Sequence, residues 1–245
     1  LLGIDIGTQK IAALLARTRG GEISLCGLGL AQSEGLRRGE IIDLEKATSA
    51  ISRAVNNIAP PAWKHASRQP ADLQDLASAK LPARAWVGIT GDHIRCFNPR
   101  AEIPISRPGR AIIPRDLEQV MRTAVGSVDM PPGHEVIHVI ASTFSVYNGQ
   151  LASKPKPGQK SAQPSGASTA REPASRSNIT NPLGMPADRL EVQAHVVTAA
   201  SVALGYLERC MEQAGLGVQG VVLEPLASAD AVLSEAEREL GVVLI

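Results

Sequence analysis

The sequence predicts an α/β fold with a second, smaller α+β region, on the basis of three stretches of patterned apolar residues. The first stretch is typical of three strands followed by a helix. The second contains short strands around a helix, and the third alternates strand and helix. A chain of 245 residues, 44% of them hydrophobic, can form one large domain or two modest ones with a sizeable core.

The first stretch begins with three apolar runs separated by Gly-rich or polar turns. These runs predict strands at Leu1–Ile6, Lys10–Arg17 and Glu22–Ala31. Asp43 is a suitable helix N-cap, and apolar residues recur after it at helical spacing. Two consecutive prolines then end the predicted helix.

The second stretch follows an irregular, Pro-rich segment at residues 60–82. Two short strands are expected around Gly91 and Asp92, and "AEIPIS" predicts a third. A helix is expected to start near Pro114, since proline suits the first turn. "HEVIHVIASTFSV" then predicts one or two further strands.

Residues 149–180 are rich in Pro, Ser, Ala, Gly and Lys and contain very few large apolar side chains. Because burial cannot offset the entropy lost on ordering them, we expect a disordered surface loop. The third stretch predicts a strand at 189–200, a helix at about 201–214 and a strand that runs into a helix over 217–233. The final "GVVLI" is expected to begin another strand.

Composition limits the function classes. Lys+Arg 25 against Asp+Glu 24, without a basic cluster interleaved with aromatics, argues against nucleic-acid binding. Cys26, Cys96 and Cys210 lack metal-site spacing and are interpreted as buried small hydrophobes in a reducing compartment. There is no signal peptide and no apolar run near the ~20 residues of a membrane span. Since there is no initiator methionine and the last residues resemble an interrupted strand, we expect a piece of a longer protein.

The first candidate site lies in "GIDIGTQK", where the first strand stops at an acid, a glycine and a threonine. Successive amides in the turn Gly7, Thr8, Gln9 and Lys10 can form an anion-binding concavity, with a hydroxyl and a charge from Thr8 and Lys10. Asp5 is positioned to hold Mg²⁺ through its waters. An ordinary hairpin turn explains the same residues, so these residues alone leave both interpretations open.

The second candidate site lies in "VVLEPLASADAVL", where Glu224 and Pro225 end a strand and small residues begin a helix. A glutamate at such a junction can position an attacking water near a γ-phosphate. A solvated glutamate before a proline at the first helical position is the alternative. Four isolated histidines are expected to be strand residues rather than ligands: His93, His134, His138 and His195.

Taken together, these motifs resemble the actin, Hsp70 and sugar-kinase superfamily, and within it the bacterial cell-division actin homologues of the FtsA family. D-I-G-T resembles the first phosphate loop of the superfamily, and E-P-L-A-S-A resembles the E-P-x-A-A-A connecting segment of its Hsp70-type members. The resemblance covers nearly the whole chain except 60–80 and 149–180. It also includes "GLRRGEIIDLEKATSAISRAV", "VGITGDHIRCFN", "NPLGM", "LEVQAHVVTA" and "LASADAVLSEAERELGVVLI".

The resemblance implies an actin-like (ribonuclease-H-like) first lobe with an inserted small α+β subdomain of the SHS2 type. It assigns residues 1–83 and 198–239 to subdomain 1A, 84–197 to the inserted subdomain 1C, and 240–245 to the start of a truncated second lobe. It also implies ATP and Mg as cofactors of the full-length protein.

By the same resemblance, the site roles are metal binding through water for Asp5, phosphate binding for Gly7, Thr8, Gln9 and Lys10, and water positioning for Glu224. The second half of family members completes the nucleotide cleft. We therefore expect this chain alone neither to bind ATP tightly nor to hydrolyse it, and at most a weak ATPase in the full-length protein. Exposed apolar surface and self-association are expected where that half would pack.

The resemblance further implies an adaptor that helps to anchor the FtsZ ring to the cytoplasmic membrane and recruits later division proteins. It places the protein in the cytoplasm, at the inner membrane face of the division site. Self-association is expected through the inserted subdomain, and membrane contact only through a C-terminal helix outside these 245 residues. A pilus-assembly actin homologue and a sugar or acetate kinase are the alternatives. "GITGDHI" and "ERELGVV" favour the division type, and no convincing substrate-binding acid or phosphoacceptor base supports a kinase.

Overall fold

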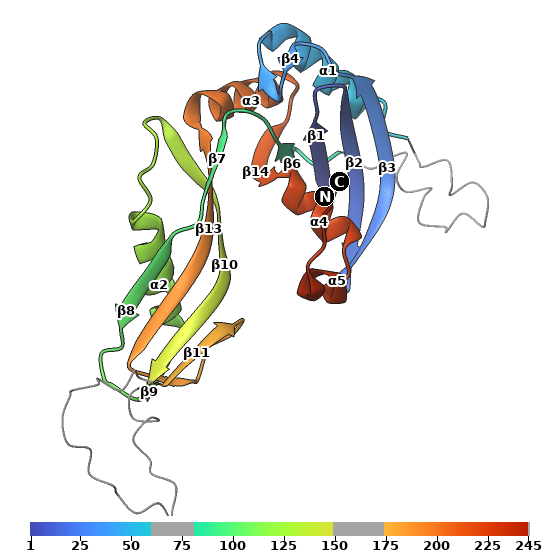
Figure 1. Ribbon diagram of the computed structural model, residues 1–245. Coiled ribbons are helices and arrows are strands. Elements are labelled where there is room, and N and C mark those ends of the chain that lie inside the picture. Colours follow the sequence, from blue (N-terminus) through green and yellow to red (C-terminus); the bar gives the residue numbers. More distant parts are fainter. Residues whose placement is uncertain (60–80, 149–173, 245) are drawn as a thin grey trace, which may run out of the picture. The chain divides into compact units, whose positions relative to one another are not determined.

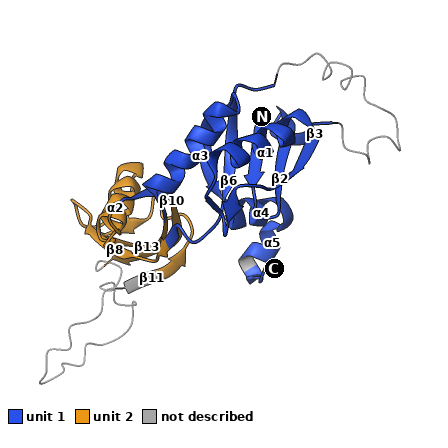
Figure 2. Ribbon diagram, turned by 90° about the horizontal axis from the view of Figure 1, so that it is seen from above, with its two compact units in different colours: residues 1–95, 133–137, 198–245 blue, residues 96–132, 138–197 orange. Residues whose placement is uncertain are grey.

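The computed structural model describes residues 1–59, 81–148 and 174–244, and the chain divides into two compact units. Figure 2 shows both units in separate colours. Unit 1 comprises residues 1–95, 133–137 and 198–245, and unit 2 comprises residues 96–132 and 138–197. Each unit has its own cluster of buried apolar side chains.

Unit 1 is built on a five-stranded mixed sheet with the order β14-β6-β1-β2-β3 (Figure 1). β1 pairs antiparallel with β2, which pairs antiparallel with β3, whereas β6 runs parallel to both β1 and β14. The strands are β1 (Leu2–Ile6), β2 (Lys10–Arg19), β3 (Glu22–Gln32), β6 (Arg84–Ile89) and β14 (Gly217–Leu223).

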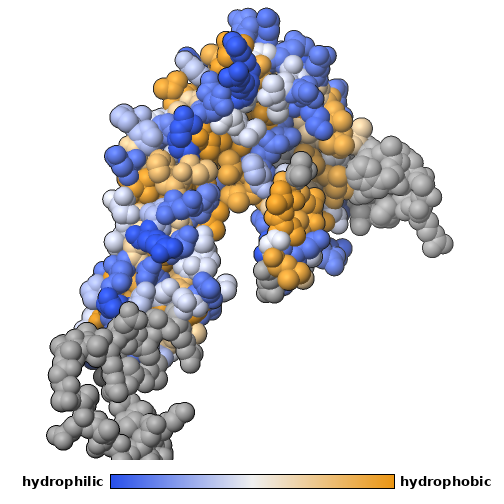
Figure 3. All heavy atoms as spheres, in the orientation of Figure 1, coloured by the Kyte–Doolittle hydropathy of each residue, from blue (hydrophilic) through white to orange (hydrophobic). Residues whose placement is uncertain are grey.

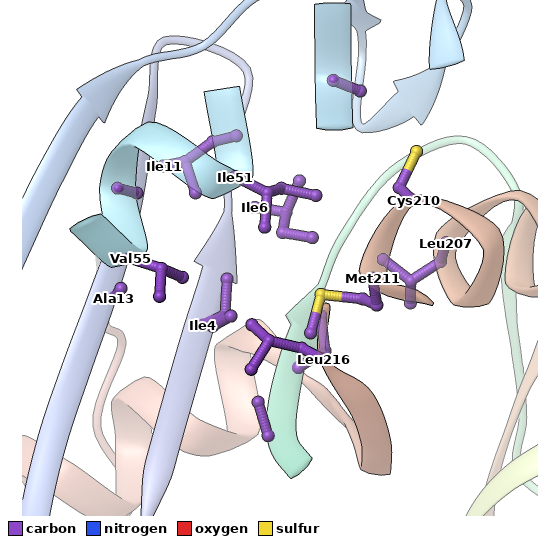
Figure 4. Close-up of a cluster of buried hydrophobic side chains, with 14 of the residues drawn as sticks. Ile4, Ile6, Ile11, Ala13, Ile51, Val55, Leu207, Cys210, Met211 and Leu216 are labelled. Atoms are coloured by element: carbon purple, nitrogen blue, oxygen red, sulfur yellow. The ribbon is translucent and has the colours of Figure 1, made fainter. Parts of the chain in front are cut away.

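Helices α1 (Leu44–Asn56) and α3 (Ser201–Gln213) pack against this sheet and against each other. Figure 4 shows isoleucines of β1 and β2 meeting apolar side chains of both helices. α1 begins as expected, because the Asp43 carboxylate accepts a hydrogen bond from the Lys46 amide at 3.1 Å. α4 (Glu224–Val232) and α5 (Glu235–Leu240) follow β14.

A small hairpin, β4 (Leu36–Arg37) and β5 (Glu40–Ile41), precedes α1 and was not expected from the sequence. Its two turn residues both have positive φ, 50° for Arg38 and 78° for Gly39. Positive φ at both central positions is the requirement of a type I′ turn, which matches the twist of the paired strands. Such two-residue strands are too short to produce a visible apolar pattern.

Unit 2 contains most of a second sheet, with the order β11-β10-β13-β7 and β8 paired to β13. α2 (Pro114–Gly126) packs on β8 and buries Val120 and Ala124 in the unit's core. The strands of this second sheet are β7 (Ile94–Phe97), β8 (Arg100–Pro104), β10 (His134–Asn148), β11 (Ala174–Ile179) and β13 (Arg189–Ala200). Two short strands, β9 (Arg110–Ala111) and β12 (Pro186–Ala187), pair with each other.

The expected α/β class and the longer strands and helices are confirmed, and four details are wrong. The expected loop at 149–180 falls outside the described residues up to 173, but its end forms β11, because pairing with β10 and packing of Ile179 against the core of unit 2 order this segment. The last residues, 241–244, form no strand in this structure. Cys96 is exposed, unlike the other two cysteines. His93 lies in the turn before β7 rather than in a strand.

His93 gives unit 1 a predicted pH dependence. The side chain is only 9% exposed, and its Nδ1 has no hydrogen-bond partner among the described residues. Burial lowers the pKa of His93, an effect that Glu40 partly opposes. Because the unfolded histidine titrates near 6.5, stability should be complete above that pH and should decrease as the pH falls below it.

We therefore expect the melting temperature to fall by a few degrees between pH 7.5 and pH 5.5, and His93→Gln to reduce that fall. Burial also lowers the pKa of His138, which lies in unit 2. Part of the fall in the melting temperature of the whole chain should therefore remain in the variant. Differential scanning calorimetry at both pH values measures the effect. His195→Gln is the matched control, and an equal reduction in that control would contradict the assignment to His93.

Candidate functional site

The two candidate acids lie at the same edge of the unit 1 sheet. Asp5 is in the second-last position of β1, and Glu224 is the first residue after β14. β6 lies between these strands, parallel to both, and pairs Gly88 with Asp5 and Ile89 with Leu223. The carboxyl ends of the three parallel strands thus lie side by side, the usual place for ligands of open α/β sheets (Figure 1).

The two carboxylates influence one another. Burial raises the pKa of Asp5, and the charge of Lys10 partly lowers it again. Burial raises the pKa of Glu224 as well, and the nearby charge of Asp5 raises it further. Oδ1 of Asp5 is buried and has no hydrogen-bond partner within the described part of the chain. Two repelling carboxylates and an unpartnered oxygen form an arrangement that a cation would stabilise.

We predict that Asp5→Asn lowers the pKa of Glu224, because the substitution removes the like charge that raises it. The carboxyl ¹³C shift of Glu224, followed over a pH titration, measures this directly. Asp129→Asn, which removes an exposed carboxylate of unit 2, is the control and should leave the Glu224 titration unchanged. An unchanged Glu224 pKa in Asp5→Asn would show that the two carboxylates do not interact.

The turn after β1 is tight and leaves part of its backbone accessible. The Gly7 amide donates to the Lys10 carbonyl at 3.1 Å and closes the turn, so this amide is used within the protein. A Cβ on Gly7 would lie 3.0 Å from the same carbonyl oxygen, a tight contact that disfavours a larger residue at this position. Thr8, Gln9 and Lys10 are exposed. The amides of Thr8 and Gln9 have no hydrogen-bond acceptor among the described residues, so they are available to an anion.

Sequence reasoning did not find Gly88, which the structure places beside Asp5. A Cβ on Gly88 would lie 3.7 Å from the Asp5 Cα and 3.8 Å from its Oδ1. The absent side chain leaves space against the acid at the point where β6 approaches β1. The available signal was a glycine inside the apolar run "WVGI", since a strand glycine often indicates a close approach of backbone or ligand.

Protein ligands alone do not complete a metal site here. Within residues 1–59, 81–148 and 174–244, no group of three or more His, Cys, Asp or Glu side chains is arranged to hold a metal. Two carboxylates with room for water fit Mg²⁺, which usually keeps several waters and takes the rest of its ligands from phosphate. The histidines lie elsewhere: His134 Nδ1 is 3.1 Å from Thr198 Oγ1, and His195 Nδ1 is 2.7 Å from Asn98 Oδ1.

None of the described helices has the length and apolar character needed to cross a membrane. Exposed apolar side chains cluster near the last residues of unit 1 (Figure 3). They include Val232 at 62%, Leu240 at 86% and Val243 at 86% exposure. An exposed apolar patch of this kind is typical of an interaction surface.

Comparison with known proteins gives consistent results. A family model described as "SHS2 domain inserted in FTSA" matches residues 91–156. Cell division protein FtsA of Pseudomonas aeruginosa is 31% identical over 246 residues, which cover 100% of this chain and 48% of that protein. FtsA of Neisseria meningitidis is 28% identical, covering 99% of this chain and 48% of that protein, and FtsA of Escherichia coli K12 is 26% identical with 100% and 48% covered.

Among solved structures, a chain of a "PilM-PilN type IV pilus biogenesis complex" superposes with a TM-score of 0.47 at 12% identity, covering 94% of this chain and 48% of that chain. The curated relatives favour the division type of protein over the pilus type. The chain spans about half the length of the curated relatives that it matches. Over its whole length, the chain is similar in sequence to the first half of cell division protein FtsA, and residues 91–156 match the model of the SHS2 domain inserted in that family.

Proposed function

We propose that this chain forms the first lobe of an actin-like, ATP-binding cell-division adaptor, with the nucleotide phosphates bound at the carboxyl edge of the unit 1 sheet. The observation that carries the proposal is the buried, unpartnered Oδ1 of Asp5 beside Glu224 and Gly88, within the described residues. The site offers two carboxylates to a cation and accessible amides to an anion. Magnesium nucleotide combines these two requirements.

The proposed roles follow from position. Asp5 holds Mg²⁺ through water, and the metal supplies charge neutralisation for the phosphates. Thr8 and Gln9 donate their amides to phosphate, and Lys10 adds positive charge. Gly7 keeps the turn tight. Glu224, whose pKa is raised by burial and by Asp5, orients a water toward the terminal phosphate.

The cellular role that we propose follows from homology with FtsA. The complete protein links the FtsZ ring to the cytoplasmic membrane at the division site and recruits later division proteins. Its second half supplies another phosphate loop and the base pocket, so the 245-residue chain alone should hold ATP weakly. Residues 240–245 then begin the second lobe, and the inserted subdomain mediates self-association.

Paramagnetic NMR tests the metal and phosphate sites even at weak affinity. Mn²⁺ added to the ¹⁵N-labelled chain should broaden the amide signals of Gly7 and Gly88 first, and Mg·ATP should shift those of Thr8 and Gln9. Asp5→Asn should remove the broadening, whereas Asp129→Asn, in unit 2, should retain it. Broadening that is equal in both variants, or an ATP-induced shift confined to other residues, would refute the proposed site.

A further inference from the structure

We propose that unit 2 carries a second binding site, a pocket for carboxylate side chains of an acidic peptide segment in a partner protein. The pocket lies between the end of β8, the following connection and the first turn of α2. Three arginines, Arg107, Arg110 and Arg115, line it together with one buried carboxylate, Asp116. This site belongs to unit 2 and does not depend on the nucleotide site proposed for unit 1.

Arg110 forms a fixed wall of the pocket. Its two Nη atoms each donate to one carboxylate oxygen of Asp116 at 2.7 Å. Its Nη1 also donates to the Ala111 carbonyl at 2.8 Å, and its Nε donates to Ser106 Oγ at 3.3 Å. These bonds hold the guanidinium in place and compensate its charge. The Arg110 side of the pocket is therefore already ordered before a ligand binds, which reduces the entropy lost on binding.

Arg107 and Arg115 supply the charge that remains. Both side chains are exposed, and neither has an Asp or Glu oxygen within ion-pair distance among the described residues, although the charge of Arg115 helps to lower the pKa of Asp116. Asp116, already bound to Arg110, is the one acid among the pocket-lining residues. Two guanidinium forks that face one hollow match carboxylate groups, which accept two parallel hydrogen bonds from each fork.

The distribution of charge favours an acidic partner. By sequence, unit 2 has eleven Lys and Arg against seven Asp and Glu, a net charge of +4, although the whole chain has +1. The balance in unit 1 is fourteen against seventeen, a net charge of −3. Complementary charge steers association and selects partners. Three of the four net positive charges of unit 2 lie in residues 149–173, outside the described structure, so the local positive charge of the pocket comes from Arg107 and Arg115.

The lining of the pocket favours a peptide over other polyanions. No aromatic side chain lines it, so nucleic-acid bases have no stacking surface. The arginines face a single hollow rather than forming the extended basic face that lies along a membrane. Ile113 is 45% exposed beside the charges and can contact the methylene groups of a glutamate side chain.

NMR titration of the ¹⁵N-labelled 245-residue chain with the peptide Ac-Glu-Glu-Glu-NH₂ tests the proposal. The Nε signals of Arg107 and Arg115 should shift on titration, and affinity should fall with added salt. The double variant Arg107→Gln/Arg115→Gln should raise the dissociation constant about tenfold or more. Arg122→Gln removes an exposed arginine of α2 that does not line this pocket, and it should leave the constant unchanged.

Ac-Gln-Gln-Gln-NH₂ and inorganic phosphate are the comparison probes. Binding of phosphate but not of the glutamate peptide would overturn the assignment to an acidic peptide, as would equal binding of the glutamine peptide. Equal affinities in the double variant and in Arg122→Gln would overturn the location. If the double variant does not fold, the single variant Arg107→Gln takes its place. Arg107 makes no ion pair in the described structure, so this variant should fold. Because Arg107 lines the pocket, the variant must still weaken binding.

Discussion

Replacing Gly39 by alanine should destabilise unit 1 by about 3–5 kcal/mol and lower its melting temperature by about 10 °C. Gly39 has φ +78°, where an added Cβ is strained, and that Cβ would overlap the Thr90 carbonyl oxygen and approach the Gly91 Cα at 2.8 Å. Both obstacles are backbone atoms. The hairpin and the turn after β6 would therefore have to separate, and the turn after β6 follows the strand that carries Gly88.

Gly21 provides a matched control for this prediction. Its φ is +87°, close to that of Gly39, but a Cβ there would meet no atom within 4 Å. Gly21→Ala should therefore cost only the conformational term, about 1 kcal/mol. Thermal and urea unfolding of both variants separates the two contributions. Similar losses in the two variants would show that the close approach of Gly39 to Thr90 adds no steric cost.

Elements with a long apolar pattern were predictable from sequence, and elements held by backbone contacts were not. The core helix α1 was predictable because Asp43 and the periodic apolar residues after it act within one segment. Strand β11 owes its order to pairing with β10, which is remote in sequence. At Gly39 the 36–41 hairpin lies too close to Thr90 to leave room for a Cβ, and no local sequence pattern reports this tertiary contact. Local chemistry therefore predicts an element only where local forces dominate.

The same distinction applies to the candidate site. Asp5 and Glu224 were each identifiable from sequence. Each is an acid at or near the end of an apolar strand, and this is visible within a single short stretch of the chain. Their proximity was not identifiable in this way, since it requires β6 to lie between β1 and β14 and parallel to both. Gly88 acquires its significance only through this order, which places it against the Asp5 side chain. Strand order is a tertiary property, and the effect of Asp5 on the pKa of Glu224 follows from it.

Asp116→Ala should have the largest effect in unit 2, a loss of about 3 kcal/mol. The Asp116 side chain is 8% exposed and accepts two hydrogen bonds from Arg110, whose own side chain is 25% exposed. It also accepts the Ile113 amide at 2.9 Å, and this bond satisfies one free donor at the start of α2. Removing the carboxylate leaves the guanidinium and that amide without this acceptor.

Glu118→Ala is the matched control. Glu118 lies on the same helix and its Oε2 is 3.8 Å from Arg122 Nη2, but both side chains of this pair are exposed. The substitution should change stability by less than about 0.5 kcal/mol. Amide hydrogen exchange of α2 distinguishes the variants, since exchange should accelerate across the helix in Asp116→Ala alone. Equal protection in both variants would show that the Arg110–Asp116 pair contributes nothing to the start of α2.

The effect of Asp116→Ala on stability should also depend on pH, which provides an independent test. Hydrogen bonding from Arg110 holds the pKa of Asp116 below its usual value near 3.8. The folded carboxyl thus binds its proton less readily than the unfolded one. The stability that the pair contributes should be complete above the unfolded pKa and should be lost as the pH falls through the folded pKa. Wild type and Asp116→Ala should therefore differ most near neutral pH and converge in acid. A difference that persists at pH 2 would assign the loss to packing rather than to the charged pair.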